Sequence, residues 1–461
     1  MIPARELAAI IDNIGVPNPI NLALSDSVTV GTGDGEILVS LNTPHGPTAG
    51  YLKRLREELP KQFPDMEFFA QPADIVSQIL NFGLPAPIDI QVTGPLPNAE
   101  KNYEVATQIA AQLRGVPGAV DVHVQQILDA PRIRIDADRA LALETGGLTQ
   151  RDVANSVLVS LSGTGATTTN FWLNYKNGVS YQVVVQTQQN RVASLDALHR
   201  TPVAVAGQAA PQLLRNLADF SRTVTPLSLN HYNVQPVFDV YAGVQGRDLG
   251  SVASEVYDII AKFQTQLPKG SSIVVRGQVL SMNQSFLALA LGIAFAVLFV
   301  YFLMVVNFQS WLDPLIILMA LPGALAGILW ALFTTGTTIS VPALMGCIMA
   351  IGVATSNSIL MITFANEQRH PEFGAHEARE AALLAGRTRL RPVLMTALAM
   401  LIGMLPMSLG LGEGGEQNAP LGRAVIGGLM VATFYTLFFV PVTYSVLRRK
   451  PPKDFGAEDQ P

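Results

Sequence analysis

Long apolar runs fill the last third of the chain, with almost no charged positions inside them. At about 1.5 Å per helical residue, each run is long enough to cross the roughly 30 Å hydrocarbon layer of a bilayer. We therefore expect five transmembrane helices, the second of them kinked at Pro322-Gly323. The predicted spans are Phe286–Val306, Leu315–Phe333, Val341–Ala365, Val393–Leu411 and Ala424–Leu447.

The first 280 residues show a different pattern, in which strands and helices alternate. Pro87–Gly94 alternates as a strand, Asn102–Arg114 has helical periodicity, and Ala119–Val124 is a second strand. The order is typical of a split βαβ, ferredoxin-like domain, although chance similarity among α/β segments is the alternative. The same order returns in Val237–Ala242, Asp248–Leu267 and Ser272–Arg276.

Two further segments complete the prediction for this α+β part. Phe171–Val183 places an Asn-Gly pair between strand formers, which is a strong hairpin signal. Upstream, a strand and two helices are expected at Gly35–Leu41, Ala49–Gln62 and Pro72–Phe82. The predicted fold class is thus an α+β soluble part with ferredoxin-like βαβ repeats, followed by a bundle of five transmembrane helices.

Charge follows the same division of the chain. Of 65 charged side chains, 45 precede residue 281, and Asp313 is the only charge between Gly277 and Asn366. The net charge of −5 offers no basic footprint for nucleic acid. A single cysteine, Cys347, excludes a disulfide framework and a cysteine-based metal site.

The distribution of Lys and Arg predicts the orientation. Five arginines lie in Glu367–Arg391 and a basic cluster starts at Arg448, so both segments are expected on the cytoplasmic side. Five crossings then place residues 1–280 on the opposite face, which is the periplasm in a bacterium. Glu367–Arg391 also fits an amphipathic helix on the membrane surface, with a solvated charged segment as the alternative.

The N-terminal residues conflict with that location. Met1–Leu7 has no charged segment followed by an apolar one, and no spanning helix precedes the soluble part. We therefore expect the chain to be the C-terminal part of a longer protein, or one half of a split one.

Residues for enzyme or metal chemistry are missing from the sequence. The histidines have no metal-ligand spacing, and eleven of the 13 methionines follow residue 280, leaving only Met66 and Met1 before it. Gly410–Gly415 matches G-x-G-x-x-G but follows a membrane helix instead of a strand. We predict no enzyme activity, no catalytic residues, no metal and no cofactor.

Four polar positions in or near the spans are candidates for function. Asn357, beside Ser356, is costly in hydrocarbon unless it is hydrogen-bonded, so it serves either helix packing or a wet path. Thr396 lies a turn or two from Arg389, a position where an arginine can also anchor the interface. No span has Asp, Glu, Lys or His in its interior, so this chain alone is not expected to couple transport to protons.

Several motifs together resemble the resistance–nodulation–cell-division (RND) efflux transporters, hydrophobe and amphiphile branch. They are Phe308–Pro314, Ile351–Leu360, Arg389–Thr396 and Gln417–Ala419 with Gly427-Gly428. The resemblance implies the C-terminal half of a trimeric inner-membrane proton antiporter. Such a pump takes small amphiphilic compounds from the periplasm or membrane and passes them through a periplasmic adaptor to an outer-membrane channel.

The resemblance also implies an assignment of subdomains. A first porter subdomain covers residues 1–95, a second 96–135 with 226–278, a docking subdomain 136–225, the transmembrane domain 279–447 and a cytoplasmic tail 448–461. A loop at Ser25–Glu36 would line the substrate path. The implied path residues are Gly31, Gly33, Gly35 and Phe82, and the implied docking residues are Asn174, Asn177 and Gly178.

The family's proton relay is only partly represented. Its two aspartates belong to a fourth helix outside this sequence, and its tenth-helix lysine aligns with Ser356. We hypothesise that a reassembled pump relies on those aspartates with Asn357, Thr396 and water. The open alternatives are an RND-like exporter of lipid or other envelope molecules, and a non-transporting membrane sensor or remnant.

Overall fold

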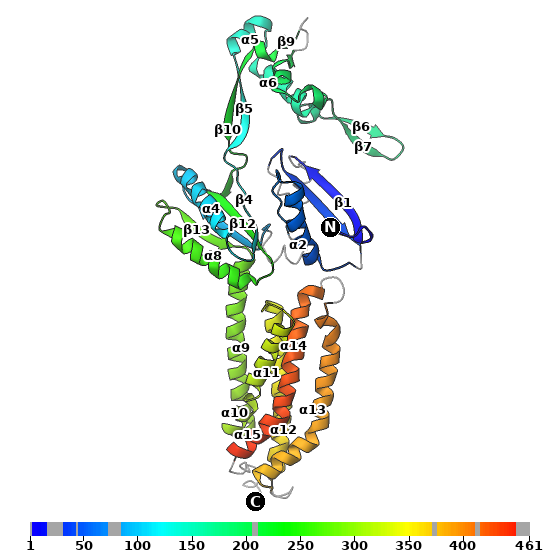
Figure 1. Ribbon diagram of the computed structural model, residues 1–461, viewed down its shortest axis with the longest axis vertical. Helices are drawn as coiled ribbons and strands as arrows, with labels where there is room; N and C mark the ends of the chain where they lie inside the picture. The colour runs from blue at the N-terminus through cyan, green and yellow to red at the C-terminus, as the bar shows by residue number, and fades with distance from the viewer. Residues whose placement is uncertain are drawn as a thin grey trace, which may run out of the picture. The chain divides into compact units, whose positions relative to one another are not determined.

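The computed structural model describes residues 2–15, 31–42, 45–71, 84–204, 211–370, 376–410 and 415–448 (Figure 1). The chain divides into two compact units. One comprises Met1–Gln125 together with Asn230–Pro461, and the other comprises Gln126–Leu229. The helix predicted at Pro72–Phe82 lies outside the described residues.

An antiparallel sheet forms the centre of the soluble part of the first unit. Its strands run in the order β4-β12-β3-β13, with a short strand β11 also paired to β12. Ile88, Ile90 and Val92 on β3 are fully buried. The strands are β3 Ile88–Thr93, β4 Ala119–Val124, β11 Asn230–Tyr232, β12 Gln235–Val244 and β13 Ser272–Arg276.

Two helices, α4 (Ala99–Leu113) and α8 (Leu249–Gln264), connect the strands of this sheet. Asp248 begins α8 by accepting the backbone N–H of Ser251 at 2.7 Å, which satisfies one of the free donors of the first turn. Helical periodicity predicts one apolar stripe from Val252 to Leu267. Its members within α8 are buried, namely Val252, Val256, Ile259, Ile260 and Phe263, whereas Leu267 lies beyond the end of the helix and is only partly buried.

A smaller α/β element precedes the central sheet. Strand β1 (Leu7–Ile14) pairs antiparallel with β2 (Gly35–Leu41), and helix α2 spans Thr48–Gln62. The bounds of β2 match the prediction, whereas β1 was not predicted. Its LAAIIDNI sequence has no clear alternation, and most of its residues are exposed.

The second unit has its own small core, formed by buried residues such as Leu148, Leu214 and Leu217. Strands β5 (Ala130–Ala137) and β10 (Ala218–Thr225) pair antiparallel. The other elements with more than three residues are α5 Arg139–Gly146, α6 Gln150–Ser162, β6 Asn170–Asn174, β7 Val179–Val183 and α7 Leu195–His199.

The predicted hairpin in this unit is β6–β7. Asn174 pairs with Val179, and Gly178 adopts a φ of +70°, the left-handed conformation that the turn requires. The Asn174 and Asn177 side chains accept the backbone N–H of Lys176 at 3.0 Å and of Val179 at 3.1 Å. These turn residues hold the two strands in register.

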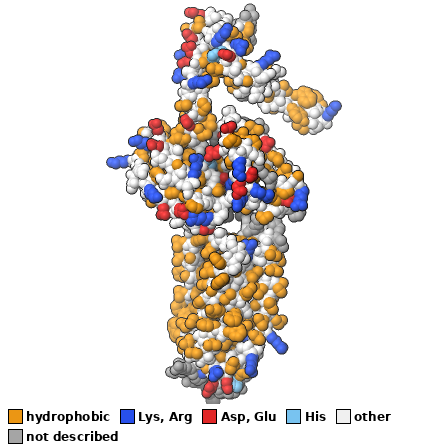
Figure 2. Space-filling view, in the orientation of Figure 1, with side chains coloured by type: hydrophobic (Ala, Val, Ile, Leu, Met, Phe, Trp, Pro, Cys, Tyr) orange, Lys and Arg blue, Asp and Glu red, His pale blue; other side chains and the backbone are white. Residues whose placement is uncertain are grey.

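Five helical stretches are long and apolar enough to cross a membrane, as predicted. Their hydrophobic side chains cover much of the face seen in Figure 2. The second stretch is broken into α10 and α11 two residues before Pro322. The helices are α9 Gln278–Phe308, α10 Leu312–Leu318, α11 Leu321–Thr334, α12 Val341–Glu367, α13 Ala378–Ser408, α14 Gly415–Phe434 and α15 Val440–Leu447.

A helix expected at Glu367–Arg391 is present in the second half of that segment. Residues from Ala378 onward form the first half of α13, which continues through Pro392 into the fourth span. Ala381, Ala382 and Ala385 are buried, so this face of the helix packs against protein. Small alanines allow the close packing, and alternation of charge with alanine produced the amphipathic signal.

Close backbone contact joins α11 to α14. A Cβ added at Gly427 would lie 2.6 Å from the carbonyl oxygen of Gly327, and one added at Gly327 would lie 2.4 Å from that of Gly427. Only glycine fits at both positions, and such small-residue contacts are the usual basis of helix association in membranes.

Asp313 is fully buried at one end of the helical bundle. Its carboxylate pairs with the guanidinium of Arg448 at 3.1 Å and accepts the side-chain amide of Asn366 at 3.4 Å. The Tyr444 hydroxyl in turn donates to Asn366 at 2.6 Å, and Arg369 donates to the backbone oxygen of Arg448 at 2.8 Å. This network, which we call the Asp313 cluster, joins α10, the end of α12 and the end of α15.

We expect Asp313→Ala to destabilise the bundle by about 3 kcal/mol, because it leaves the Arg448 guanidinium buried without its partner. Thermal unfolding of the full chain in detergent micelles measures the effect. Arg387→Ala, which removes an exposed arginine of α13, is the control. Strictly additive effects of Asp313→Ala and Arg448→Ala would show that the two residues do not stabilise each other.

Candidate functional site

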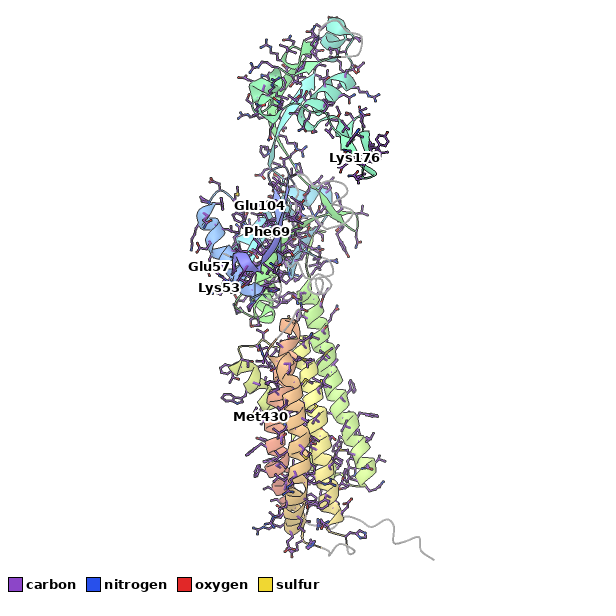
Figure 3. All side chains as sticks on the ribbon, turned by 90° about the vertical axis from the view of Figure 1, so that its right-hand side faces the viewer. Lys53, Glu57, Phe69, Glu104, Lys176 and Met430 are labelled. Carbon is purple, nitrogen blue, oxygen red and sulfur yellow. The ribbon has the colours of Figure 1, made fainter. Side chains whose placement is uncertain are left out.

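A cavity of about 240 Å³ lies beside the central sheet of the first unit. Two phenylalanines, Phe68 and Phe69, form part of its wall, and Glu67, Arg114 and Asp121 place both signs of charge around it. A narrower hollow adjoins it and shares Phe69, Asp121 and His123. Figure 3 labels Phe69, which precedes β3 in the chain and reaches this position from a segment without regular structure. Aromatic, aliphatic and charged side chains line the cavity in equal number, which suits an organic ligand with both apolar and polar groups.

His123 connects the wall of the cavity to the sheet. Its ring stacks on Phe69 with centroids 3.9 Å apart and meets Tyr241 edge-on at 5.6 Å. The Nδ1 atom lies 2.9 Å from the backbone oxygen of Asp121. Burial lowers the pKa of His123 below its ordinary value, so the ring is neutral at pH 7 and acts as an aromatic surface.

Asp121 is held by a partner far away in the sequence. Arg56 on α2 reaches both of its carboxylate oxygens, at 2.6 Å through Nη2 and 3.1 Å through Nε, and donates through Nη1 to Gln245 at 2.5 Å. Asp121 has a φ of +56° where the register of β4 with β12 shifts. The two-pronged ion pair therefore ties α2 to an irregular, strained point of the sheet at the cavity edge.

A second, exposed ion pair lies on the same cavity. Arg114 contacts Glu67 at 3.4 Å and donates to the backbone oxygen of Val122 at 3.2 Å. Because both side chains are more than half exposed, this pair contributes little to stability. Its main effect is to place one positive and one negative group at the cavity wall.

The path residues implied by the sequence lie in a different place. Gly31 is a buried turn residue whose N–H donates to the Asp34 carboxylate at 2.7 Å, Gly33 is exposed, and Gly35 begins β2. None of the three lines the cavity, and Phe82 lies outside the described residues. The cavity-lining residues Phe68, Phe69 and His123 were missed. The one local signal was the adjacent Phe68-Phe69 pair in a stretch without strand or helix periodicity.

The polar residues singled out in the spans do not form one hydrogen-bonded group. Asn357 is buried on α12, but Ser356 and Thr396 are exposed, and the Thr396 hydroxyl donates to the backbone oxygen of Val393 at 3.0 Å. The Arg389 guanidinium lies 5.2 Å from the Phe364 ring centroid. Within the described part of the chain, no hydrogen bond joins Asn357 to Thr396 or Arg389.

Other polar contacts between membrane helices are present. The hydroxyl of Ser358, next to Asn357, lies 3.2 Å from that of Thr436, and both residues are fully buried. Arg423 on α14 donates to the hydroxyl of Thr337 at 2.6 Å and to the backbone oxygen of Ser408 at 3.0 Å. These contacts, like the Asp313 cluster, satisfy polar groups where water is scarce.

We expect Arg56→Met to lower the free energy of local opening of β4 by about 3 kcal/mol. This value is at the low end for a buried ion pair, because a fifth of the Arg56 side chain is exposed. Hydrogen exchange of the β4 amides measures this local opening. Arg54→Met is the matched control, since Arg54 is exposed on the same helix and does not reach the sheet. Unchanged exchange in Arg56→Met would contradict a stabilising role for the pair.

Comparison with known proteins identifies the family. The model of the AcrB/AcrD/AcrF family matches residues 42–448. The chain is 29% identical over 443 residues to the cation efflux system protein CzcA of Alcaligenes sp. (strain CT14), covering 94% of this chain and 40% of that protein. It is 27% identical over 418 residues to the multidrug resistance protein MdtC of Pectobacterium carotovorum, covering 87% and 38%.

A crystal structure of a heavy metal efflux pump superposes with a TM-score of 0.72 and 25% identity, covering 96% of this chain and 43% of that one. The chain thus spans about two fifths of the length of the curated relatives it matches. The motifs, the five apolar helices and the family match agree, and the chain belongs to the AcrB/AcrD/AcrF family of RND efflux transporters.

Proposed function

We propose that the chain is the C-terminal half of a proton-driven RND pump that exports small amphiphilic compounds. The cavity carries this proposal. Phe68, Phe69 and the neutral ring of His123 offer apolar contact, while Glu67 and Arg114 offer charges for a polar head group. A ligand with one apolar and one polar end matches such a wall.

The second candidate is a metal-ion exporter. It is favoured by relatives whose names refer to cation efflux and by the superposition with a heavy metal efflux pump. Hard cations prefer several oxygen ligands and soft ones prefer sulfur. The residues that line this cavity include no sulfur, and their two carboxylates, Glu67 and Asp121, are each already paired with an arginine. The wall therefore makes the amphiphile our first candidate.

The subdomain boundaries carry over as part of the proposal. The strand order β4-β12-β3-β13 with α4 and α8 supports a ferredoxin-like second porter subdomain at residues 96–135 and 226–278. The predicted docking range, 136–225, falls inside the compact unit Gln126–Leu229. Residues 1–95 would be part of the first porter subdomain, 279–447 the transmembrane domain and 448–461 a cytoplasmic tail.

The proposal includes location and partners. The soluble part would face the periplasm from the inner membrane, and an N-terminal half would complete the pump. A trimer, a periplasmic adaptor and an outer-membrane channel would complete the assembly. The hairpin supports contact with a neighbouring copy, because it exposes apolar and aromatic side chains. These are Phe171, Trp172, Tyr175 and Tyr181, between 47% and 88% exposed.

Proton coupling would depend on carboxylates that the N-terminal half supplies. Asn357, buried on α12, and Thr396 on α13 are the positions we propose to assist them with water. Asn357 is preferred over Ser356, which is exposed on the same helix.

We expect Phe69→Ala to reduce export of an amphiphilic dye about tenfold, since losing an aromatic contact removes roughly 1–1.5 kcal/mol of binding. Cells lacking other pumps and expressing the chain with its N-terminal half would be loaded with dye, and efflux followed by fluorescence. Phe295→Ala, an exposed aromatic on α9, is the control. Export of Zn²⁺ or Co²⁺ without export of dye would overturn the amphiphile proposal in favour of the second candidate.

We expect the double variant Trp172→Ser, Tyr181→Ser to weaken trimer formation, because it removes an exposed aromatic pair from the hairpin. The ring centroids of this pair are 6.0 Å apart. Native mass spectrometry of the pump in detergent reports the oligomeric state. Leu161→Ser, which removes an exposed apolar side chain of α6 in the same unit, is the control. An unchanged trimer would exclude the hairpin from the contact.

A further inference from the structure

The two faces of strand β3 are chemically different, yet both are buried. Ile88, Ile90 and Val92 are on one face, and Asp89 and Gln91 are on the other. Asp89 is 0% exposed, and Asp239 on the neighbouring strand β12 is 3% exposed. Because Asp89 pairs with Tyr241 and Gln91 with Asp239, the two acids are diagonal neighbours on the same face of the sheet.

Each strand around this acid pair contributes a polar or charged group. Gln91 donates its side-chain amide to Asp89 at 3.0 Å, and Asn230 on β11 donates to Asp239 at 3.5 Å. On β13, Arg276 is opposite Asp89, and its guanidinium lies over the ring of Tyr232, 4.0 Å from the centroid. On β12 and β4, Tyr241 and His123 meet edge-on at 5.6 Å.

No salt bridge joins Asp89 to Arg276 or to any other basic side chain in the described ranges. One carboxylate oxygen of Asp89 and the amide oxygen of Gln91 are buried and have no hydrogen-bond donor among the described residues. A proton on Asp89 would supply that donor. If the Gln91 side-chain amide is rotated so that its oxygen and nitrogen exchange places, the O–H of protonated Asp89 would donate to the Gln91 oxygen across the same 3.0 Å contact.

Two buried carboxylates on adjacent strands cannot both carry a charge at low cost, since each disfavours ionisation of the other. We propose that Asp89 and Asp239 bind one proton between them at neutral pH, so that the central sheet of the soluble part contains a proton-binding site. This site adjoins the cavity through Tyr241 and His123 but consists of different residues, and it does not depend on which substrate the pump exports.

The direction of the titration follows from burial. Burial, reinforced by the charge of Asp239, raises the pKa of Asp89 from 3.8 to about 8. The folded protein therefore keeps a proton that the unfolded chain loses between these pH values. The contribution of Asp89 to stability is therefore largest in acid, falls as pH rises from about 4 to about 8, and is lost above that.

Infrared difference spectroscopy of the full chain in detergent tests the site by the C=O stretch of a protonated carboxylic acid. We expect a band at pH 6 that is half lost near pH 8. Asp239→Asn removes the neighbouring charge, so the midpoint of Asp89 should shift to lower pH. Asp89→Asn and the double variant should lose the transition near pH 8.

Two control variants assign the signal. Asp258→Asn changes an exposed acid of α8 and should leave the band unchanged. Asp313→Asn checks the other deeply buried acid, in the Asp313 cluster, and should also leave the pH 8 transition in place. The proposal is overturned if wild-type protein has no protonated carboxyl at pH 6, if the double variant keeps the transition near pH 8, or if neither single variant changes that transition.

Hydrogen exchange of the β3 and β12 amides gives a second measurement on the same protein. Corrected for the intrinsic pH dependence of exchange, protection in wild type should fall between pH 6 and pH 9. In the double variant it should stay level, because neither acid of the pair remains to lose a proton. If protection of these amides changed with pH equally in wild type and in the double variant, the proposal would be contradicted.

Discussion

The membrane half depends on a backbone contact between α11 and α14. At Gly327 and Gly427 an added Cβ on either helix would lie within 2.6 Å of the other's carbonyl oxygen, so no larger side chain fits without moving a helix. In a bilayer the hydrophobic effect does not hold helices together, and close packing of small residues replaces it. The same close packing joins α12 to α14. Gly346 on α12 contacts Leu421 and Ala424 on α14, and Gly428 on α14 contacts Ala350 on α12.

Once the helices are packed this closely, their polar groups have to be satisfied between them. Ser358 on α12 meets Thr436 in the helical turn after α14, and Arg423 on α14 meets Thr337 in the loop after α11. At one end of the bundle Asp313 and Arg448 neutralise each other, and Asn366 and Tyr444 extend the bonding outward. The positions of these groups follow from the packing and also strengthen it, because breaking one contact leaves a buried partner unsatisfied.

Local sequence patterns predicted the elements more accurately than the sites. β2, β4 and β13 have the predicted bounds, and the hairpin follows from the Asn177-Gly178 pair, because alternation and turn chemistry are properties of neighbouring residues. The fourth span was predicted to begin at Val393, whereas α13 begins at Ala378 and runs through Pro392, since a membrane helix tolerates an internal proline. The Arg56–Asp121 pair joins residues 65 positions apart, and the cavity joins Phe69 to β4. Such contacts between distant residues leave no periodic signal.

Asp89 and Asp313 show why the environment, more than residue type, decides what a buried acid can do. Both are fully buried aspartates. Asp313 has an arginine at 3.1 Å, so its charge is compensated and its role is to join helices. Asp89 has a second acid as its diagonal neighbour, and the nearest arginine across the sheet is turned onto the ring of Tyr232. With no cation in contact, a proton is the simplest partner for that carboxylate. This difference is why we place the proposed proton-binding site in the soluble sheet and assign the Asp313 cluster the role of joining helices.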